Sequence, residues 1–105
     1  DPQFGPVIMF GLGGVWVEVL EDVSFKLVPL SKTDAKKAVH EIRAARLLDG
    51  FRGSPPVDTA ALEDILLRMS DFAAKTPAVA EMDLNPIFAY PHGAVAVDAR
   101  VILGA

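Results

Sequence analysis

Residues 79–103, VAEMDLNPIFAYPHGAVAVDARVIL, decide the fold. Two stretches rich in β-branched and small apolar residues, 79–90 and 94–103, flank the tripeptide Pro91-His92-Gly93. Strand formers on both sides of a turn that contains Pro and Gly are typical of an antiparallel hairpin. Pro86 has no backbone N–H to donate, so we expect a bend, a bulge or an edge position there.

The two predicted strands separate polar from apolar side chains. Because side chains alternate along a strand, Asp83 and Asn85 share one face, and Asp98 and Arg100 share a face of the returning strand. A turn centred between residues 91 and 92 sets Asn85 opposite Asp98 and Asp83 opposite Arg100. Directly opposed residues have Cβ atoms about 5 Å apart, so these four side chains are predicted to lie together.

The chemistry of this group permits two interpretations. An Asn and an Asp opposite each other, with the Asp83 carboxylate one step away, supply hard oxygen ligands of the kind that Mg²⁺ takes together with phosphate oxygens and water. Arg100 can balance Asp83 or reach a phosphate. The simpler interpretation is an exposed hairpin face on which Asp83 and Arg100 form a surface ion pair. The pattern by itself favours the simpler interpretation.

The rest of the chain predicts three strands followed by two helices. Apolar and alternating stretches indicate strands at 6–11, 15–20 and 23–30, with a tight turn at Glu21-Asp22. Ser31 and Asp34 form a possible capping box before a helix with apolar residues at 35, 38, 39, 42 and 45, for which Gly50 is the C-terminal stop. Asp58 can cap a second helix that ends at Thr76-Pro77.

The predicted order is therefore β-β-β-α-α-β-β. This order indicates an α+β domain, an antiparallel or mixed sheet with two helices packed on one face. Gly11-Leu12-Gly13-Gly14 resembles a phosphate-binding loop only superficially, because no Gly-Lys-Ser/Thr follows, and a structural turn is favoured.

The composition indicates how many domains the chain forms and which partners it can have. The 105 residues are expected to form one domain, 1–105, with 51% hydrophobic residues and a net charge of −4. Neither nucleic acid nor an anionic membrane is an expected partner of such a chain. The absence of cysteine excludes disulfides and thiolate sites and fits a cytoplasmic location. Because the chain starts at Asp1, it is expected to be a processed product or, preferably, an excised piece.

Ordered motifs along the whole chain carry a family resemblance. They are Asp1-Pro2-Gln3-Phe4-Gly5-Pro6-Val7, residues 10–23 (FGLGGVWVEVLEDV), residues 47–58 (LLDGFRGSPPVD), Glu81-Met82-Asp83-Leu84-Asn85-Pro86 and Val97-Asp98-Ala99-Arg100. In this order they resemble the C-terminal subdomain of the ATP-grasp domain of NDP-forming acyl-CoA synthetases, the ADP-forming acetyl-CoA synthetase group. They are more distantly similar to the β subunit of succinyl-CoA synthetase.

The resemblance implies a function for the hairpin. These enzymes interconvert acyl-CoA, ADP and phosphate with acid, CoA and ATP through a phosphohistidine in another domain. By resemblance, Asn85 and Asp98 bind Mg²⁺ with ATP or ADP, and Asp83 is an additional or outer ligand. Glu18 is implied only as a residue that lines the nucleotide site. Arg100 is a candidate for phosphate contact. Arg52 could contact a phosphate or the neighbouring domain, although an Arg on a loop is more often solvated or caps a helix.

The resemblance also implies missing parts. The family's upstream nucleotide-binding residues, the remaining ATP-grasp subdomain and the CoA-binding and ligase domains are the expected partners. Half a cleft cannot desolvate the phosphates, so the isolated chain is expected to have no ligase activity and weak nucleotide binding at best. An alternative remains open, a regulatory or assembly domain of ATP-grasp type fused, for example, to a protein acetyltransferase.

Overall fold

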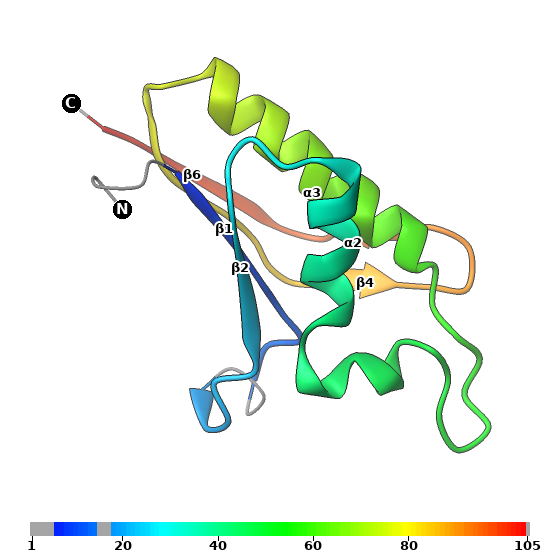
Figure 1. The fold of residues 1–105 in the computed structure, drawn as a ribbon. Helices are drawn as coiled ribbons and strands as arrows, with labels where there is room; N and C mark the ends of the chain where they lie inside the picture. Colours follow the sequence, from blue (N-terminus) through cyan, green and yellow to red (C-terminus); the bar gives the residue numbers. More distant parts are fainter. Residues whose placement is uncertain (1–5, 15–17, 105) are drawn as a thin grey trace.

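The computed structural model describes residues 6–14 and 18–104. Two helices lie on the same side of a set of antiparallel strand pairs (Figure 1). The elements are β1 (Val7–Gly11), β2 (Val23–Leu27), α2 (Lys32–His40), the 3₁₀ helix η1 (Arg43–Leu47), α3 (Thr59–Lys75), β3 (Val79–Leu84), β4 (Ile87–Ala89), β5 (Ala94–Ala96) and β6 (Ala99–Leu103). The predicted α+β class is confirmed. No helix among the described residues is long and apolar enough to cross a membrane.

Strands β1 and β2 form an antiparallel ribbon with two different faces. Ile8 is buried against the helices, and the buried Ser24 donates its Oγ hydrogen to the Ala38 carbonyl at 2.6 Å. On the opposite face Met9 pairs with Phe25, and both are more than half exposed. The ribbon therefore covers the helices with one face and leaves an apolar face uncovered.

The predicted strand 15–20 is wrong in its described part. Residues 15–17 lie outside the described residues, but residues 18–20 form a helical turn and not a strand. The Glu18 N–H donates to the Gly14 carbonyl at 2.9 Å, an i to i−4 bond. Gly13 and Gly14 adopt φ of +84° and +56°. That left-handed backbone reverses the direction of the chain. The described residues after it therefore form a helical turn, although their types favour a strand.

The first predicted helix is correct at its start and too long at its end. The capping box is present: the Ser31 N–H donates to Asp34 at 2.9 Å, and the Asp34 N–H donates to the Ser31 Oγ at 3.0 Å. Helix α2 ends at His40, however, and η1 follows. The buried Asp22 carboxylate accepts the N–H groups of Arg43 and Ala44. These donors are thus withdrawn from a continuing helix, which explains the break.

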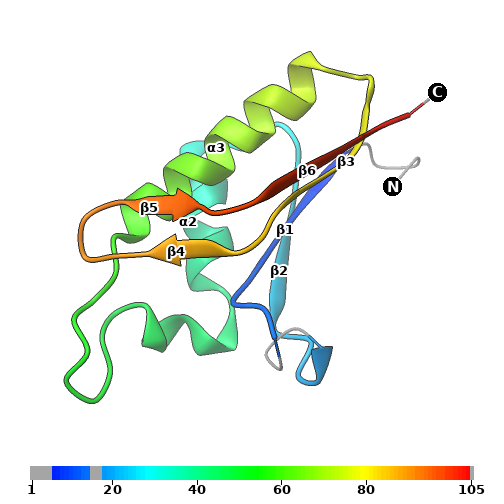
Figure 2. The same ribbon diagram turned by 180° about the vertical axis from the view of Figure 1, so that it is seen from behind.

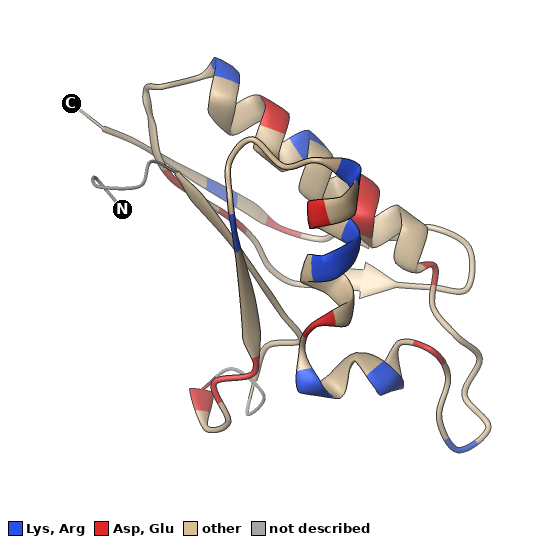
Figure 3. Ribbon diagram, in the orientation of Figure 1, with Lys and Arg blue, Asp and Glu red and all other residues tan. Residues whose placement is uncertain are grey.

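Helix α3 is the longest element and agrees with the prediction at both ends. Asp58 caps it by accepting the Ala61 N–H at 3.0 Å, and it ends before Thr76. Both Lys or Arg and Asp or Glu occur along α3 (Figure 3). Its exposed side carries the ion pairs Arg68–Asp64 and Lys75–Asp71. Its inner side joins the core, whose buried members are Ile8, Ala35, Ala38, Val39, Leu48, Leu62 and Leu66.

Three of the predicted strands are shorter or divided. The third one ends at Leu27, because Pro29 has no N–H and the Leu30 N–H donates to the buried Ser70 Oγ at 2.7 Å. In the C-terminal hairpin, Pro86 and Asp98 divide the two long strands into β3 with β6 and β4 with β5. Figure 2 shows the β4–β5 hairpin continuing from the end of the β3–β6 pair.

Candidate functional site

The C-terminal hairpin brings the predicted site residues together. Asp83 pairs with Arg100 across β3 and β6, and the Asn85 N–H donates to the Asp98 carbonyl at 3.2 Å. The predicted register is therefore confirmed. Asp83, Asn85, Asp98 and Arg100, with Ala99, line one shallow hollow of about 200 Å³. The alternation of side chains along the predicted strands thus correctly grouped these four polar residues around one hollow.

The oxygen atoms in this hollow are accessible. Asp83, Asn85 and Asp98 are all exposed. One Asp98 oxygen, Oδ1, accepts the N–H of Ala99 at 2.9 Å, which fixes the carboxylate and leaves Oδ2 unused by that bond. No side-chain hydrogen bond occupies Asp83 or Asn85 within the described residues. The donor set is available to an external ligand.

This donor set suits one kind of metal ion. Two carboxylates and one amide oxygen are hard ligands. Asp83 lies on β3, and Asn85 and Asp98 lie just beyond the β3–β6 pair, where a backbone hydrogen bond joins them. No group of three or more His, Cys, Asp or Glu side chains in the described part of the chain could form a complete metal cage. Mg²⁺ requires no such cage, because it retains waters and completes its shell with substrate phosphates. The residues therefore fit a Mg²⁺ ion whose remaining positions are filled by waters and phosphate oxygens.

The surface ion pair of the simpler interpretation is not formed. Asp83 and Arg100 are opposed in the ladder, but the ion pairs among described residues are Lys26–Glu41, Arg68–Asp64 and Lys75–Asp71. The Arg100 guanidinium borders the hollow without a carboxylate partner there. A guanidinium keeps its charge at any relevant pH and binds phosphate through several N–H groups.

Two predicted residues lie outside this hollow. Glu18 is exposed on the helical turn after Gly14, and it does not line the hollow. Arg52 sits on the loop after η1 with φ of +52°, and its guanidinium lies 5.5 Å from the centroid of the Phe51 ring. Within this chain, neither residue joins the Asn85–Asp98 group.

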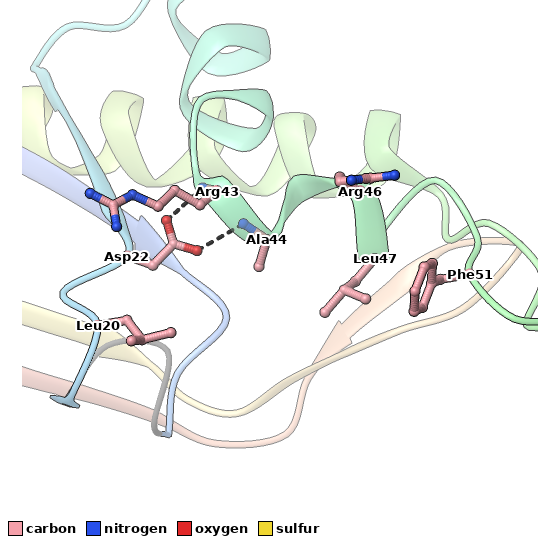
Figure 4. A pocket seen from close by; sticks show the side chains of 7 residues that line it. All are labelled: Leu20, Asp22, Arg43, Ala44, Arg46, Leu47 and Phe51. Atoms are coloured by element: carbon pink, nitrogen blue, oxygen red, sulfur yellow. Dashed lines mark hydrogen bonds between the residues drawn. The ribbon is translucent and has the colours of Figure 1, made fainter.

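A larger groove of about 310 Å³ lies elsewhere, between η1 and the turn before β2. Figure 4 shows Leu20, Leu47 and Phe51 around it, with Asp22 bonded to the start of η1. Its surface is almost entirely apolar, and its one lining carboxylate is already occupied by backbone donors. Arg43 and Arg46 also line the groove, but its one carboxylate is occupied, so the groove offers no free carboxylate to a metal ion. The larger volume of this groove therefore does not make it the metal site.

Asp58 has a second contact that the sequence pattern did not predict. Besides capping α3, it accepts the Gly93 N–H at 2.8 Å through its other oxygen, and its own N–H donates to the Tyr90 carbonyl at 2.7 Å. The hydrogen bonds from Gly93 and Ala61 lower the pKa of Asp58, because they stabilise the charged carboxylate. The capping signal was visible in the sequence, but the contact across 35 residues was not.

Comparison with known proteins identifies the family. The ATP-grasp domain family matches residues 1–103. The chain belongs to the ATP-grasp family, and its relatives include ADP-forming acetate–CoA ligases. It is 52% identical over 98% of its length to the β subunit of acetate–CoA ligase [ADP-forming] I of Pyrococcus furiosus, of which it covers 44%. It is 51% identical to acetate–CoA ligase [ADP-forming] I of Archaeoglobus fulgidus, and here 99% of the chain covers 15% of that protein.

A solved structure has the same fold. The dinucleotide-forming acetyl-coenzyme A synthetase 1 of Ca. Korarchaeum cryptofilum, in complex with coenzyme A and Mg-AMPPCP, matches 99% of this chain with a TM-score of 0.94 and 54% identity. The match covers 49% of that chain. The present chain therefore spans less than half the length of these relatives, and their full activities extend beyond the part compared.

Proposed function

We propose that this chain supplies the Mg²⁺-binding half of the nucleotide site in an ADP-forming acyl-CoA synthetase. The observation that carries the proposal is the hollow in which Asn85 and Asp98 face each other beside Asp83 and Arg100. The parent enzyme would interconvert acyl-CoA, ADP and phosphate with acid, CoA and ATP. The parent enzyme would work in the cytoplasm, where this chain acts together with the remaining ATP-grasp, CoA-binding and ligase domains.

Each residue of the hollow has a defined part. The Asn85 amide oxygen and the Asp98 carboxylate would hold Mg²⁺ from the two opposed chain segments that join β3 to β4 and β5 to β6. Asp83 would bind it directly or through a water. When bound, the ion neutralises charge on the terminal phosphates of the nucleotide. Arg100 would donate hydrogen bonds to phosphate oxygens. These groups position the phosphates, and no residue of this chain is required to transfer a proton.

The uncovered face of the β1–β2 ribbon supports the partner part of the proposal. Val7, Met9, Phe25 and Leu27 follow one another in register on this face and are 39–59% exposed. Contiguous apolar surface of this kind is typical of an interface. Since the chain covers 44% of its Pyrococcus furiosus relative, the rest of the parent protein is available to cover that face.

The proposal is tested by Asn85→Ala and Asp98→Ala in the complete protein that carries this chain. Each substitution removes a ligand from an exposed position, so the fold should survive while acyl-CoA-dependent ATP formation falls by 100-fold or more (about 2.7 kcal/mol, at about 1.36 kcal/mol for each factor of ten). Asp71→Asn is the matched control, because Asp71 is an exposed carboxylate on the outer side of α3. Near-normal turnover in either ligand variant would refute the assignment.

A further inference from the structure

Asp58 joins two parts of the fold at one carboxylate. Its Oδ1 accepts the Ala61 N–H in the first turn of α3, and its Oδ2 accepts the Gly93 N–H in the turn between β4 and β5. The Asp58 N–H also donates to the Tyr90 carbonyl on the other side of that turn. One residue thus holds both sides of the hairpin turn against the start of the helix.

From this turn an unbroken run of backbone bonds leads to the candidate site. The Tyr90 N–H donates to the Gly93 carbonyl at 3.0 Å, and three residue pairs of β4 and β5 follow. Beyond Pro86, the Val97 N–H donates to the Pro86 carbonyl at 2.9 Å. The next bond is the one from Asn85 to Asp98. The two proposed ligands therefore sit between the β3–β6 pair and the β4–β5 hairpin, whose turn Asp58 holds.

The core supports this hairpin on one face only. Ile87, Ala89 and Ala94 pack against the buried cluster, while Phe88 and Val95 are 50% and 56% exposed. Small side chains at 89 and 94 make few contacts, so packing alone defines the position of the turn weakly. A charge-assisted bond at the turn adds a directional restraint that these alanines cannot provide.

We infer that Asp58 is a positioning residue, which sets the β4–β5 hairpin relative to α3 and so keeps Asn85 and Asp98 in place for Mg²⁺–nucleotide. The inference rests on the proposed function of the hollow, but it concerns a residue outside the hollow. Preorganised ligands bind more tightly, because the ordering does not have to be achieved on binding.

Asp58→Asn separates the two roles of the side chain. Asn caps helices as well as Asp does, but its side chain has only one acceptor oxygen. That oxygen can accept the N–H of Ala61 or that of Gly93, whereas Asp58 accepts each of them with a separate oxygen. Asp58→Ser is a second variant, since Ser also caps helices and has a single oxygen on a shorter side chain. Ser31→Ala is the control, because it removes the cap of α2 and leaves the hairpin untouched.

The experiment uses the complete protein and two readouts. Hydrogen exchange of the segment containing Gly93 should accelerate about 10-fold in Asp58→Asn and Asp58→Ser, the factor expected for one lost charge-assisted bond. The KM for Mg²⁺–ADP should rise about 5- to 10-fold with a smaller change in kcat. Ser31→Ala should alter neither quantity by more than about twofold.

Three results would overturn the inference. They are unchanged exchange at Gly93, faster exchange with an unchanged KM, and an equal rise in KM in Ser31→Ala. Failure of the proposed function has a different signature, in which Asn85→Ala and Asp98→Ala leave Mg²⁺–ADP binding unaltered. If those two variants weaken Mg²⁺–ADP binding and Asp58→Asn does not, only the positioning role of Asp58 is refuted.

Discussion

Replacing Asp22 by Asn tests whether a single carboxylate ends helix α2 and holds η1. The Asp22 side chain is 4% exposed, and its two oxygens accept separate backbone N–H groups from Arg43 and Ala44, the latter at 2.8 Å. Asn keeps one acceptor and turns an NH₂ group toward the other backbone donor. The chain therefore loses one bond to a charged acceptor and gains a donor–donor conflict at a buried position.

The expected cost follows from these contacts. A hydrogen bond to a charged group contributes about 1.5–3 kcal/mol, so Asp22→Asn should lower the free energy of unfolding by about 2–3 kcal/mol. For a domain of about this size, each kcal/mol corresponds to roughly 4–8 °C in Tm. The change should therefore lower Tm by about 10–20 °C. Asp22 lines the larger groove, so this variant also separates a structural role from a ligand-binding one.

Urea denaturation followed by far-ultraviolet circular dichroism measures the cost directly. Asp71→Asn is the control, with an expected change within about 0.5 kcal/mol because that carboxylate is exposed. In the complete protein, the folded fraction of Asp22→Asn should keep normal Mg²⁺–ADP affinity. A cost below about 0.5 kcal/mol would refute the explanation given for the helix break. Lost affinity at normal stability would assign the groove a role in binding.

Three further predictions concern stability. Gly50→Ala should cost about 1–3 kcal/mol in urea denaturation, because Gly50 has φ of +95° and an added Cβ would lie 3.0 Å from the Ser54 carbonyl oxygen; an unchanged midpoint would contradict this. Val39→Ala should cost about 2–3 kcal/mol by the same assay, since Val39 is fully buried and loses two methyl groups with incomplete collapse of the space; a neutral result would mean that this part of the core is loosely packed. The pKa of Asp34 is lowered chiefly by hydrogen bonds from Ser31, and the pKa of Asp58 chiefly by the hydrogen bond from Gly93. The two carboxylates therefore stabilise the fold at any pH above their unfolded-state pKa of about 3.9. This stabilisation is lost as the pH falls through their lower folded-state pKa. Unfolding followed from pH 6 to pH 2 should therefore show a smaller acid-induced loss in the double variant Asp34→Asn, Asp58→Asn than in the unaltered chain, and parallel curves would contradict the linkage.

Local signals predicted much of this fold. The capping box at Ser31 and Asp34 and the cap at Asp58 depend on residues within one turn of the chain, and both predictions were correct. The register of the C-terminal hairpin followed from alternation and from the position of the turn. The same alternation correctly grouped the four polar side chains of the hollow, because strand pairing leaves each of them only one face to occupy.

Distant contacts account for the errors. Helix α2 stops because Asp22, 21 residues before Arg43, captures backbone donors that periodicity assigned to the helix. The predicted strand at 15–20 failed in its described part, where Gly13 and Gly14 redirect the chain into a helical turn. The bond between Asp58 and Gly93 joins residues 35 apart. No local pattern specifies which of several polar groups such an acceptor will meet, so these features could not be read from sequence.

The central claim is that Asn85 and Asp98 hold a Mg²⁺ ion that arrives with the nucleotide. Titration calorimetry of the complete protein with ADP, with and without Mg²⁺, measures it most directly when the unaltered protein is compared with Asp98→Asn. In the unaltered protein Mg²⁺ should tighten ADP binding, and in Asp98→Asn most of that increment should disappear while Mg²⁺-free binding stays the same. An equal Mg²⁺-dependent increment in the two proteins would contradict the account.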